Sequence, residues 1–395
     1  MPGPRRRELL AALALGGLAA PRVAAQPQAG SAPLQLLRTG DIGGLPWIEL
    51  PLQGLATRWL VDSGATAAVI APALAERLQL RPLSPISVAL AGGVQTLPRY
   101  RLPALLAGGL ASEAAAIARD LQQLLGEAGG RLDGAVGAPW LHERVTRFDF
   151  AAGRLHWGPP PGAVAAAAAV LPLVWDQGLP VVSLALGARA AEGFVFDTGN
   201  AGALLLFARR AAALRGELGA LPTTTVRELG GSVHAGFARI ERLVAPGWVA
   251  REVPAALEGG DAPHRGMHFD RLAGSLGSAL FEPGAVTLDG PGARLIVELP
   301  GLPEPPALPG GFGFRLSVDN GLRIGAVIAA SPAALAGVQA GDAVQAIDGV
   351  DARAWSPAQA WQQLAGREQV KLQLFAQGRS RLVELRRERF FPLLR

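Results

Sequence analysis

The stretches WLVDSG at residues 59–64 and FVFDTG at residues 194–199 repeat one pattern, and together they decide the fold. Each begins with three large apolar residues and continues with an aspartate, a hydroxyl residue and a glycine. The apolar run predicts a buried strand, and the glycine permits a sharp turn that a side chain would hinder. Each stretch therefore places its aspartate, Asp62 or Asp197, at the end of a core strand. A carboxylate there needs hydrogen-bond partners, and the adjacent hydroxyl and backbone N–H groups are the candidates.

The similarity extends over a long segment around the two aspartates. The further copies are GLP at 44–46 and 178–180, GG at 92–93 and 230–231, and a spaced Asp, Arg and Leu at 149–155 and 289–295. The offset between copies rises slowly, from 134 residues (44 to 178) to 140 residues (155 to 295), as small loop insertions would produce. Four matches in the same order indicate an internal duplication.

Proline- and glycine-rich stretches mark the boundaries between the parts of the chain. GPPPG at 158–162 and LPGLPEPPALPGG at 299–311 are typical of extended linkers. Short apolar or alternating runs between Gly and Pro turns predict mainly β structure, with a helix after each aspartate turn at 72–80 and 205–218. We therefore predict five parts. They are a signal peptide at residues 1–25, a first β-lobe at 33–158, a homologous second β-lobe at 168–299, a Pro-rich linker at 300–310 and a smaller C-terminal domain at 311–390.

Composition narrows the function classes. Hydrophobic residues make up 50% and charged residues 17% of the chain, which provides apolar surface for packed cores and excludes a disordered chain. Much of the net charge of +5 comes from arginines near the N-terminus, and no basic stripe interleaved with aromatics remains. Nucleic acid is therefore not an expected partner. Cysteine is absent, which excludes disulfides and thiolate metal sites.

The N-terminus has the three parts of a signal peptide. RRR at 5–7 is the charged region, residues 9–20 form an apolar run, and VAA at 23–25 offers a cleavage site before Gln26. The run is too short to span a bilayer stably, and no later segment has the length and apolarity of a transmembrane helix. RRELL at 6–10 resembles a twin-arginine signal, while an ordinary secretory signal with an extra arginine is the alternative. We expect an exported protein, periplasmic or secreted.

The two aspartate motifs resemble the signature of aspartic peptidases of the pepsin and retroviral type, in which Asp-Ser/Thr-Gly follows a hydrophobic strand. In that family a later hydrophobic strand ending in Gly crosses behind each aspartate loop, and residues 135–141 and 275–280 fit this pattern. The resemblance covers residues 34–299 and is greatest to bacterial relatives of the retroviral enzymes, with both halves fused in one chain. It also implies two β-hairpin flaps, whose tips would lie at Gly92 and Gly93 and at Gly230 and Gly231.

The resemblance implies that Asp62 and Asp197 are the catalytic dyad. The supporting residues would be Ser63, Gly64, Thr198, Gly199 and Asn200. Two carboxylates held close together share one proton, because both cannot ionise easily. The ionised partner would take a proton from a water molecule, which attacks the peptide carbonyl while the protonated partner hydrogen-bonds it, without a covalent intermediate or a cofactor.

One supporting residue departs from the family pattern. Asn200 stands where Ala, Ser or Thr is usual. Its amide would either donate to Asp197 and lower the pKa of that carboxyl, or crowd the attacking water. The departure also keeps open a second function class, in which the lobes form a catalytically silent peptide-binding scaffold.

A metal-dependent hydrolase is the third alternative. His264 and His268 have the spacing to share one face of a helix and hold a divalent metal. Pro263 and Gly266 interrupt that stretch, however, and no glutamate completes a zinc-peptidase pattern. We interpret it as a polar loop and predict no metal site. No Gly-x-Ser-x-Gly elbow and no phosphate-binding glycine loop are present.

The C-terminal domain resembles the PDZ domains attached to bacterial envelope peptidases. Ser-Pro pairs at 331–332 and 356–357 predict two helix starts among apolar strands. GFGF at 311–314 matches the loop whose backbone N–H groups receive a terminal carboxylate, so Phe312, Gly313 and Phe314 are the predicted peptide-binding residues. A peptide would add as a strand beside residues 314–318, along the helix that carries Trp361 and Leu364. The alternative is that no peptide binds and that the groove is empty or occupied by the protein's own linker.

Together these observations predict an exported aspartic endopeptidase whose PDZ domain recruits or gates its substrate. The expected partners are peptide or protein substrates and a C-terminal peptide ligand of the PDZ domain. Because both lobes lie in one chain, catalysis needs no dimer, and we expect a monomer.

Overall fold

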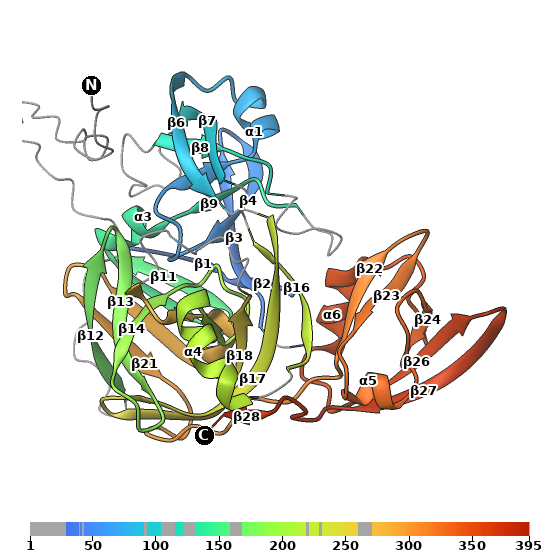
Figure 1. Ribbon diagram of the computed structural model, residues 1–395. Coiled ribbons are helices and arrows are strands. Elements are labelled where there is room, and N and C mark those ends of the chain that lie inside the picture. Colours follow the sequence, from blue (N-terminus) through green and yellow to red (C-terminus); the bar gives the residue numbers. More distant parts are fainter. Residues whose placement is uncertain are drawn as a thin grey trace, which may run out of the picture.

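The computed structural model describes residues 29–38, 40–41, 43–90, 93–103, 115–121, 131–158, 168–218, 221–228, 231–259 and 271–394. The predicted signal peptide, Gly92, Gly230, His264 and His268 lie outside these residues. The described chain is mainly β, as predicted, and its strands form sheets of fourteen, eight and six strands. Figure 1 shows the two larger sheets stacked in one body, with the third at its side.

The first lobe is built on the eight-stranded sheet. Its strands, in spatial order, are β2 (Gln35–Leu37), β3 (Leu45–Leu52), β4 (Leu55–Val61), β9 (Gly134–Val136), β5 (Ala68–Ile70), β8 (Ala115–Ala118), β7 (Gly93–Arg101) and β6 (Pro82–Leu90). Strands β3 and β4 form a hairpin whose two turn residues, Gln53 and Gly54, both have positive φ. Such a turn matches the twist of the strands that it joins.

The second lobe repeats this arrangement. Its strands, in spatial order, are β13 (Leu179–Leu186), β14 (Glu192–Phe196), β19 (Gly274–Leu276), β15 (Leu204–Leu206), β18 (Trp248–Glu258), β17 (Gly231–Ala245) and β16 (Thr223–Glu228). In each lobe a short strand from late in the sequence, β9 or β19, lies parallel to the strand that leads to the aspartate. The strand order is the same as in the first lobe from β3 onward, as an internal duplication would produce.

A bridging part of the fourteen-stranded sheet joins the lobes. Its strands are β1 (Gly30–Pro33), β11 (Arg154–Gly158), β10 (Val145–Asp149), β20 (Ala285–Asp289), β21 (Arg294–Glu298) and β12 (Ala169–Asp176). Strands β10 and β20 are antiparallel, with Val145 opposite Asp289 and Asp149 opposite Ala285. The repeated aspartates also have one structural task, since Asp149 accepts the Ala152 N–H and Asp289 accepts the Gly292 N–H in the turns that follow.

Short helices follow the aspartate turns, with boundaries that differ from those predicted. Helix α1 (Pro72–Arg77) ends three residues early, and α4 (Ala208–Leu218) begins three residues late. The late start has a packing cause. Leu204–Leu206 form β15, which pairs with both β18 and β19 in the buried centre of the sheet.

The C-terminal domain has its own six-stranded sheet and core. Its elements are β22 (Phe314–Val318), β23 (Leu322–Val327), α5 (Pro332–Leu335), β24 (Ala343–Ile347), β25 (Val350–Asp351), α6 (Pro357–Leu364), β26 (Gln369–Ala376) and β27 (Arg379–Arg386). Both predicted helix starts are present, because Ser331 caps α5 and Ser356 forms a capping box with Gln359 on α6. Phe314 stacks on Trp361 in the core, with ring centroids 5.2 Å apart.

The end of the chain returns to the second lobe, which the sequence did not predict. Strand β28 (Leu393–Leu394) pairs in parallel with β17, where the Arg239 N–H donates to the Pro392 carbonyl at 2.7 Å. Phe391 stacks on Phe237 at 5.3 Å, and Leu394 is buried. The C-terminal domain is therefore tied to the second lobe through the linker before it and the tail after it (Figure 1).

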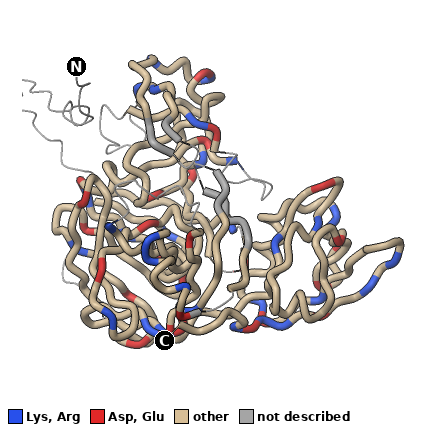
Figure 2. The backbone as a smooth tube through the Cα atoms, viewed as in Figure 1, with Lys and Arg blue, Asp and Glu red and all other residues tan. Residues whose placement is uncertain are grey.

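Charged residues of both signs are interspersed along the backbone (Figure 2). In the described ranges, no helix has the length and apolarity needed to cross a membrane.

Candidate active site

Both aspartates lie at the carboxyl ends of buried strands, as the sequence predicted. Asp62 follows β4 and Asp197 follows β14, and both strands end in fully buried residues. The Asp62 N–H donates to the Val136 carbonyl and the Asp197 N–H to the Leu276 carbonyl, each at 2.9 Å. The strands β9 and β19 thus hold the two aspartate loops by equivalent hydrogen bonds.

The hydroxyl groups of Ser63 and Thr198 bind across the lobe boundary. Thr198 Oγ1 accepts the Ser63 N–H at 3.0 Å and donates to the Val61 carbonyl at 2.6 Å. Ser63 Oγ accepts the Thr198 N–H at 2.9 Å and donates to the Phe196 carbonyl at 2.7 Å. The expectation that these hydroxyls partner their own aspartates is therefore wrong. Each instead completes the buried backbone of the opposite loop, and this fixes the two loops against each other.

The carboxylates receive their hydrogen bonds from the glycines. The Gly64 N–H donates to Asp62 Oδ1 at 2.9 Å, and the Gly199 N–H donates to Asp197 Oδ1 at 3.0 Å. A Cβ atom at Gly64 would overlap the Asp197 carboxylate, and one at Gly199 would overlap the Asp62 carboxylate. Each glycine therefore lies against the aspartate of the other lobe, and the two carboxyl groups face one another between the glycines.

The surroundings of the pair favour a shared proton. Burial, the negative charge of Asp197 and a hydrogen bond to that carboxyl together raise the pKa of Asp62 to about 8. The backbone N–H groups of Gly64 and Ala65 act in the opposite direction and are outweighed. These shifts favour one proton shared by the pair, as expected for two adjacent carboxyls in a low-dielectric site.

Asn200 is engaged within the second lobe. Its amide nitrogen donates to Ser275 Oγ at 3.1 Å, and its amide oxygen accepts the Gly202 N–H at 2.9 Å. Ser275 lies in β19, so the amide ties the aspartate loop to the strand behind it. The sequence predicts that this side chain acts on the carboxyl of Asp197 or on the attacking water. The structure instead gives it the task of fixing the loop.

Of the predicted flap glycines, Gly93 and Gly231 lie in the described chain, each at the end of a hairpin. Leu90 at the end of β6 pairs with Gly93 at the start of β7, and Glu228 at the end of β16 pairs with Gly231 at the start of β17. Gly93 and Gly231 thus open the returning strands. Each hairpin occupies the same place in its lobe, although closure over the aspartates stays a prediction.

The predicted peptide loop of the C-terminal domain is occupied by another part of the chain. The N–H groups of Phe312 and Gly313 donate to the carboxylate of Asp41, which precedes β3 in the first lobe. Sequence reasoning missed Asp41, because nothing near it in the sequence signals a distant partner. Phe312 and Phe314 have buried side chains, so the loop presents backbone groups to a ligand.

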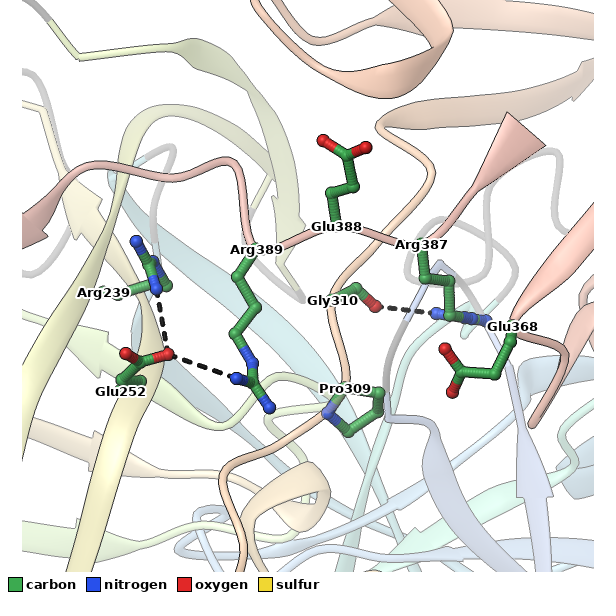
Figure 3. Close-up of a pocket in the computed structure, with 8 residues that line it drawn as sticks. All are labelled: Arg239, Glu252, Pro309, Gly310, Glu368, Arg387, Glu388 and Arg389. Atoms are coloured by element: carbon green, nitrogen blue, oxygen red, sulfur yellow. Dashed lines mark hydrogen bonds and ion pairs between the residues drawn. The ribbon is translucent and has the colours of Figure 1, made fainter.

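A separate hollow of about 500 Å³ lies where the second lobe, the linker and the C-terminal domain meet (Figure 3). Its lining is mostly charged: Arg239, Glu252, Pro309, Gly310, Glu368, Arg387, Glu388 and Arg389. Glu252 pairs with Arg239 at 2.9 Å and with Arg389 at 3.4 Å. None of the lining residues belongs to the aspartate loops, so the hollow is distinct from the carboxylate pair.

Comparison with known proteins identifies two regions of the chain. The aspartyl protease family model matches residues 48–140, and the PDZ domain model matches residues 304–376. The chain carries an aspartyl protease domain and a PDZ domain. The first match contains Asp62 and the hairpin of β6 and β7, and the second contains the loop that holds Asp41. In the described ranges, no group of three His, Asp or Glu side chains is placed to hold a metal ion.

Solved structures to which the chain is similar include two seed proteins. Gamma conglutin from lupine seeds is 12% identical, with a TM-score of 0.38, over 69% of this chain and 95% of that one. Basic 7S globulin from soybean is 13% identical, with a TM-score of 0.37, over 68% of this chain and 94% of that one. The comparison with curated protein sequences returned no match.

Proposed function

We propose that this protein is an aspartic endopeptidase in which Asp62 and Asp197 activate a water molecule to hydrolyse peptide bonds. The observation that carries the proposal is the reciprocal packing of each glycine against the carboxylate of the other lobe. This packing brings two acidic groups, 135 positions apart in the sequence (62 to 197), to one place at the lobe boundary. The aspartyl protease match over the first lobe supports the same reading.

In this proposal each group has a task in the reaction. The raised pKa of Asp62 supports one proton shared by the pair, and the protonated carboxyl donates a hydrogen bond to the carbonyl oxygen of the scissile bond. The ionised carboxyl of the pair accepts a proton from the attacking water. Gly64 and Gly199 orient the carboxyls through their N–H groups, while Ser63 and Thr198 keep the two loops in register. General acid and base catalysis by positioned groups contributes factors of about 10² to 10⁴ each.

Cleavage of a denatured protein mixture tests the proposal. Wild-type protein should cleave it at acidic to neutral pH, with pepstatin inhibiting, and the rate should fall as the pH rises through about 8, where Asp62 loses its proton. Asp62→Asn and Asp197→Asn should each lose at least about 100-fold in rate. Asp319→Asn, which changes an exposed carboxylate of the PDZ domain, is the matched control. Equal cleavage by wild type and both dyad variants would eliminate this mechanism.

We also propose that the chain is exported before it acts, on the basis of the signal-like residues 1–25. N-terminal sequencing of protein from the periplasmic or culture fraction tests this, and a mature start near Gln26 is expected. Protein that stays inside the cell with its N-terminal residues still attached would contradict the proposal.

A further inference from the structure

The carboxylate-binding loop of the PDZ domain contains a carboxylate from the same chain. Asp41 Oδ1 accepts the Phe312 N–H and Asp41 Oδ2 accepts the Gly313 N–H, each at 3.0 Å. Each oxygen thus has its own backbone donor, which is how a backbone loop captures the carboxylate of a peptide C-terminus. The two partners are 271 residues apart in the sequence, so only the tertiary structure brings them together.

The surroundings of this contact are built for a carboxylate. Arg387 is buried, and its guanidinium lies 4.5 Å from the centre of the Phe312 ring. Arg387 Nη1 donates to the backbone carbonyls of both Asp41 and Gly310, each at 2.9 Å (Figure 3 shows the second bond). A Cβ atom at Gly311 would lie 2.7 Å from Asp41 Oδ2, so glycine is needed there for the close approach. The PDZ loop therefore provides backbone N–H donors, a nearby positive charge and room for the close approach of a carboxylate.

Burying the Asp41 carboxylate in this loop carries a desolvation cost. Burial raises the pKa of its carboxyl, even though the N–H donors and the charge of Arg387 lower it. The cost of burying the ionised group thus offsets much of the gain from its contacts. A peptide C-terminus offers the same two oxygens and, in addition, a backbone that can pair with β22. In the described chain β22 pairs only with β23 and is an edge strand.

The residues next to Asp41 rest on the loop that carries Asp197. A Cβ atom at Gly43 would overlap the carbonyl oxygen of Ala201. Ser278 Oγ donates to the Gly44 carbonyl at 2.6 Å, and the Ser278 N–H donates to the Asn200 carbonyl at 2.9 Å. Asp41, which binds the PDZ carboxylate loop, is thus only two residues along the chain from Gly43, which contacts the second aspartate loop.

We propose that Asp41 is an internal ligand of the PDZ domain, which a peptide with a free C-terminal carboxylate must displace in order to bind. The resting chain then has a closed carboxylate site. Displacement releases the PDZ domain from the first lobe at a point beside the Asp197 loop. The proposal concerns binding alone and does not depend on whether Asp62 and Asp197 cleave peptides.

Hydrogen exchange measures the internal contact directly. In the full chain, mass spectrometry of a peptic fragment covering residues 309–316 should show protected amides in wild type. Asp41→Ala should raise exchange in that fragment, and Asp41→Asn, which keeps the shape but loses the charge, should raise it less. Asp319→Ala, at an exposed carboxylate in the same domain, should leave it unchanged. Identical exchange in wild type and Asp41→Ala would overturn the internal ligand.

Peptide binding measures the competition. The probe is a fluorescein-labelled pool of decapeptides with randomised internal positions and a C-terminal valine, prepared as the free acid and as the amide. An intramolecular ligand acts at an effective concentration on the order of millimolar, so the free acid should bind Asp41→Ala about tenfold more tightly than wild type. The amide should bind both weakly. Equal affinity of the free acid for the two proteins, or no preference of Asp41→Ala for acid over amide, would overturn displacement by a C-terminus.

Discussion

The proton held by the carboxylate pair should be visible in the stability of the protein. Burial and the neighbouring charge of Asp197 raise the pKa of Asp62 to about 8 in the folded chain, whereas an unfolded aspartate has a pKa of about 3.9. Between these values the folded state binds more protons than the unfolded state. The free energy of unfolding therefore falls as the pH rises through this window, by about 1.4 kcal/mol per pH unit for one proton.

Asp62→Asn removes this pH dependence of the free energy of unfolding, because the amide does not titrate and Asp197 loses its titrating neighbour. The stability of the variant relative to wild type should increase by about 3 kcal/mol between pH 5 and pH 7, whatever its value at pH 5. Urea denaturation followed by tryptophan fluorescence measures it, because Trp59 and Trp248 are buried in the two lobes and report on both.

Asp319→Asn provides the control, since its exposed carboxylate should leave the relative stability constant within about 0.5 kcal/mol. A relative change below about 1 kcal/mol in Asp62→Asn would refute the reasoning. It would mean that the pair does not hold a proton at neutral pH, and the proposed acid–base roles would fail with it.

Three further changes test the site and its framework. Thr198→Val keeps the shape but leaves a buried N–H and a buried carbonyl without their partner, so urea denaturation should show a loss of about 2–5 kcal/mol. Gly64→Ala forces a methyl group into the facing carboxylate and should reduce cleavage at least about 100-fold, whereas Gly216→Ala, at an open helical position, should leave cleavage intact. Leu394→Ala truncates a buried side chain of β28 and should lower the stability of the second lobe by about 2–5 kcal/mol, and an unchanged unfolding midpoint would show that the tail is not anchored.

Much of the fold could be predicted from local patterns in the sequence. The runs before Asp62 and Asp197 specified buried strands, and the Ser-Pro pairs specified two helix starts. These features depend on neighbours within a few residues, where periodicity, turn residues and caps act. The order of the repeated motifs also predicted two similar lobes, because a duplicated sequence repeats the same local preferences.

The boundaries of helices and strands were harder to predict from the sequence where pairing within the sheet determines them. The sequence predicted helix from residue 205, but Leu204–Leu206 form a strand because they fill the space between β18 and β19. Leucine favours helices by intrinsic propensity. The buried position between two strands outweighs that preference, and no pattern within the segment reveals which neighbours it will have.

What the sequence determined by itself was the set of parts: two acidic loops, two β-lobes and a small C-terminal domain with a carboxylate-binding loop. The tertiary structure alone decided which groups meet. Ser63 and Thr198 bind the opposite loop and not their own aspartates, Asp41 reaches the PDZ loop, and the tail pairs with β17. Such contacts depend on the surfaces that face each other once the lobes pack. Their partners lie more than 130 residues apart, so no local preference can specify them.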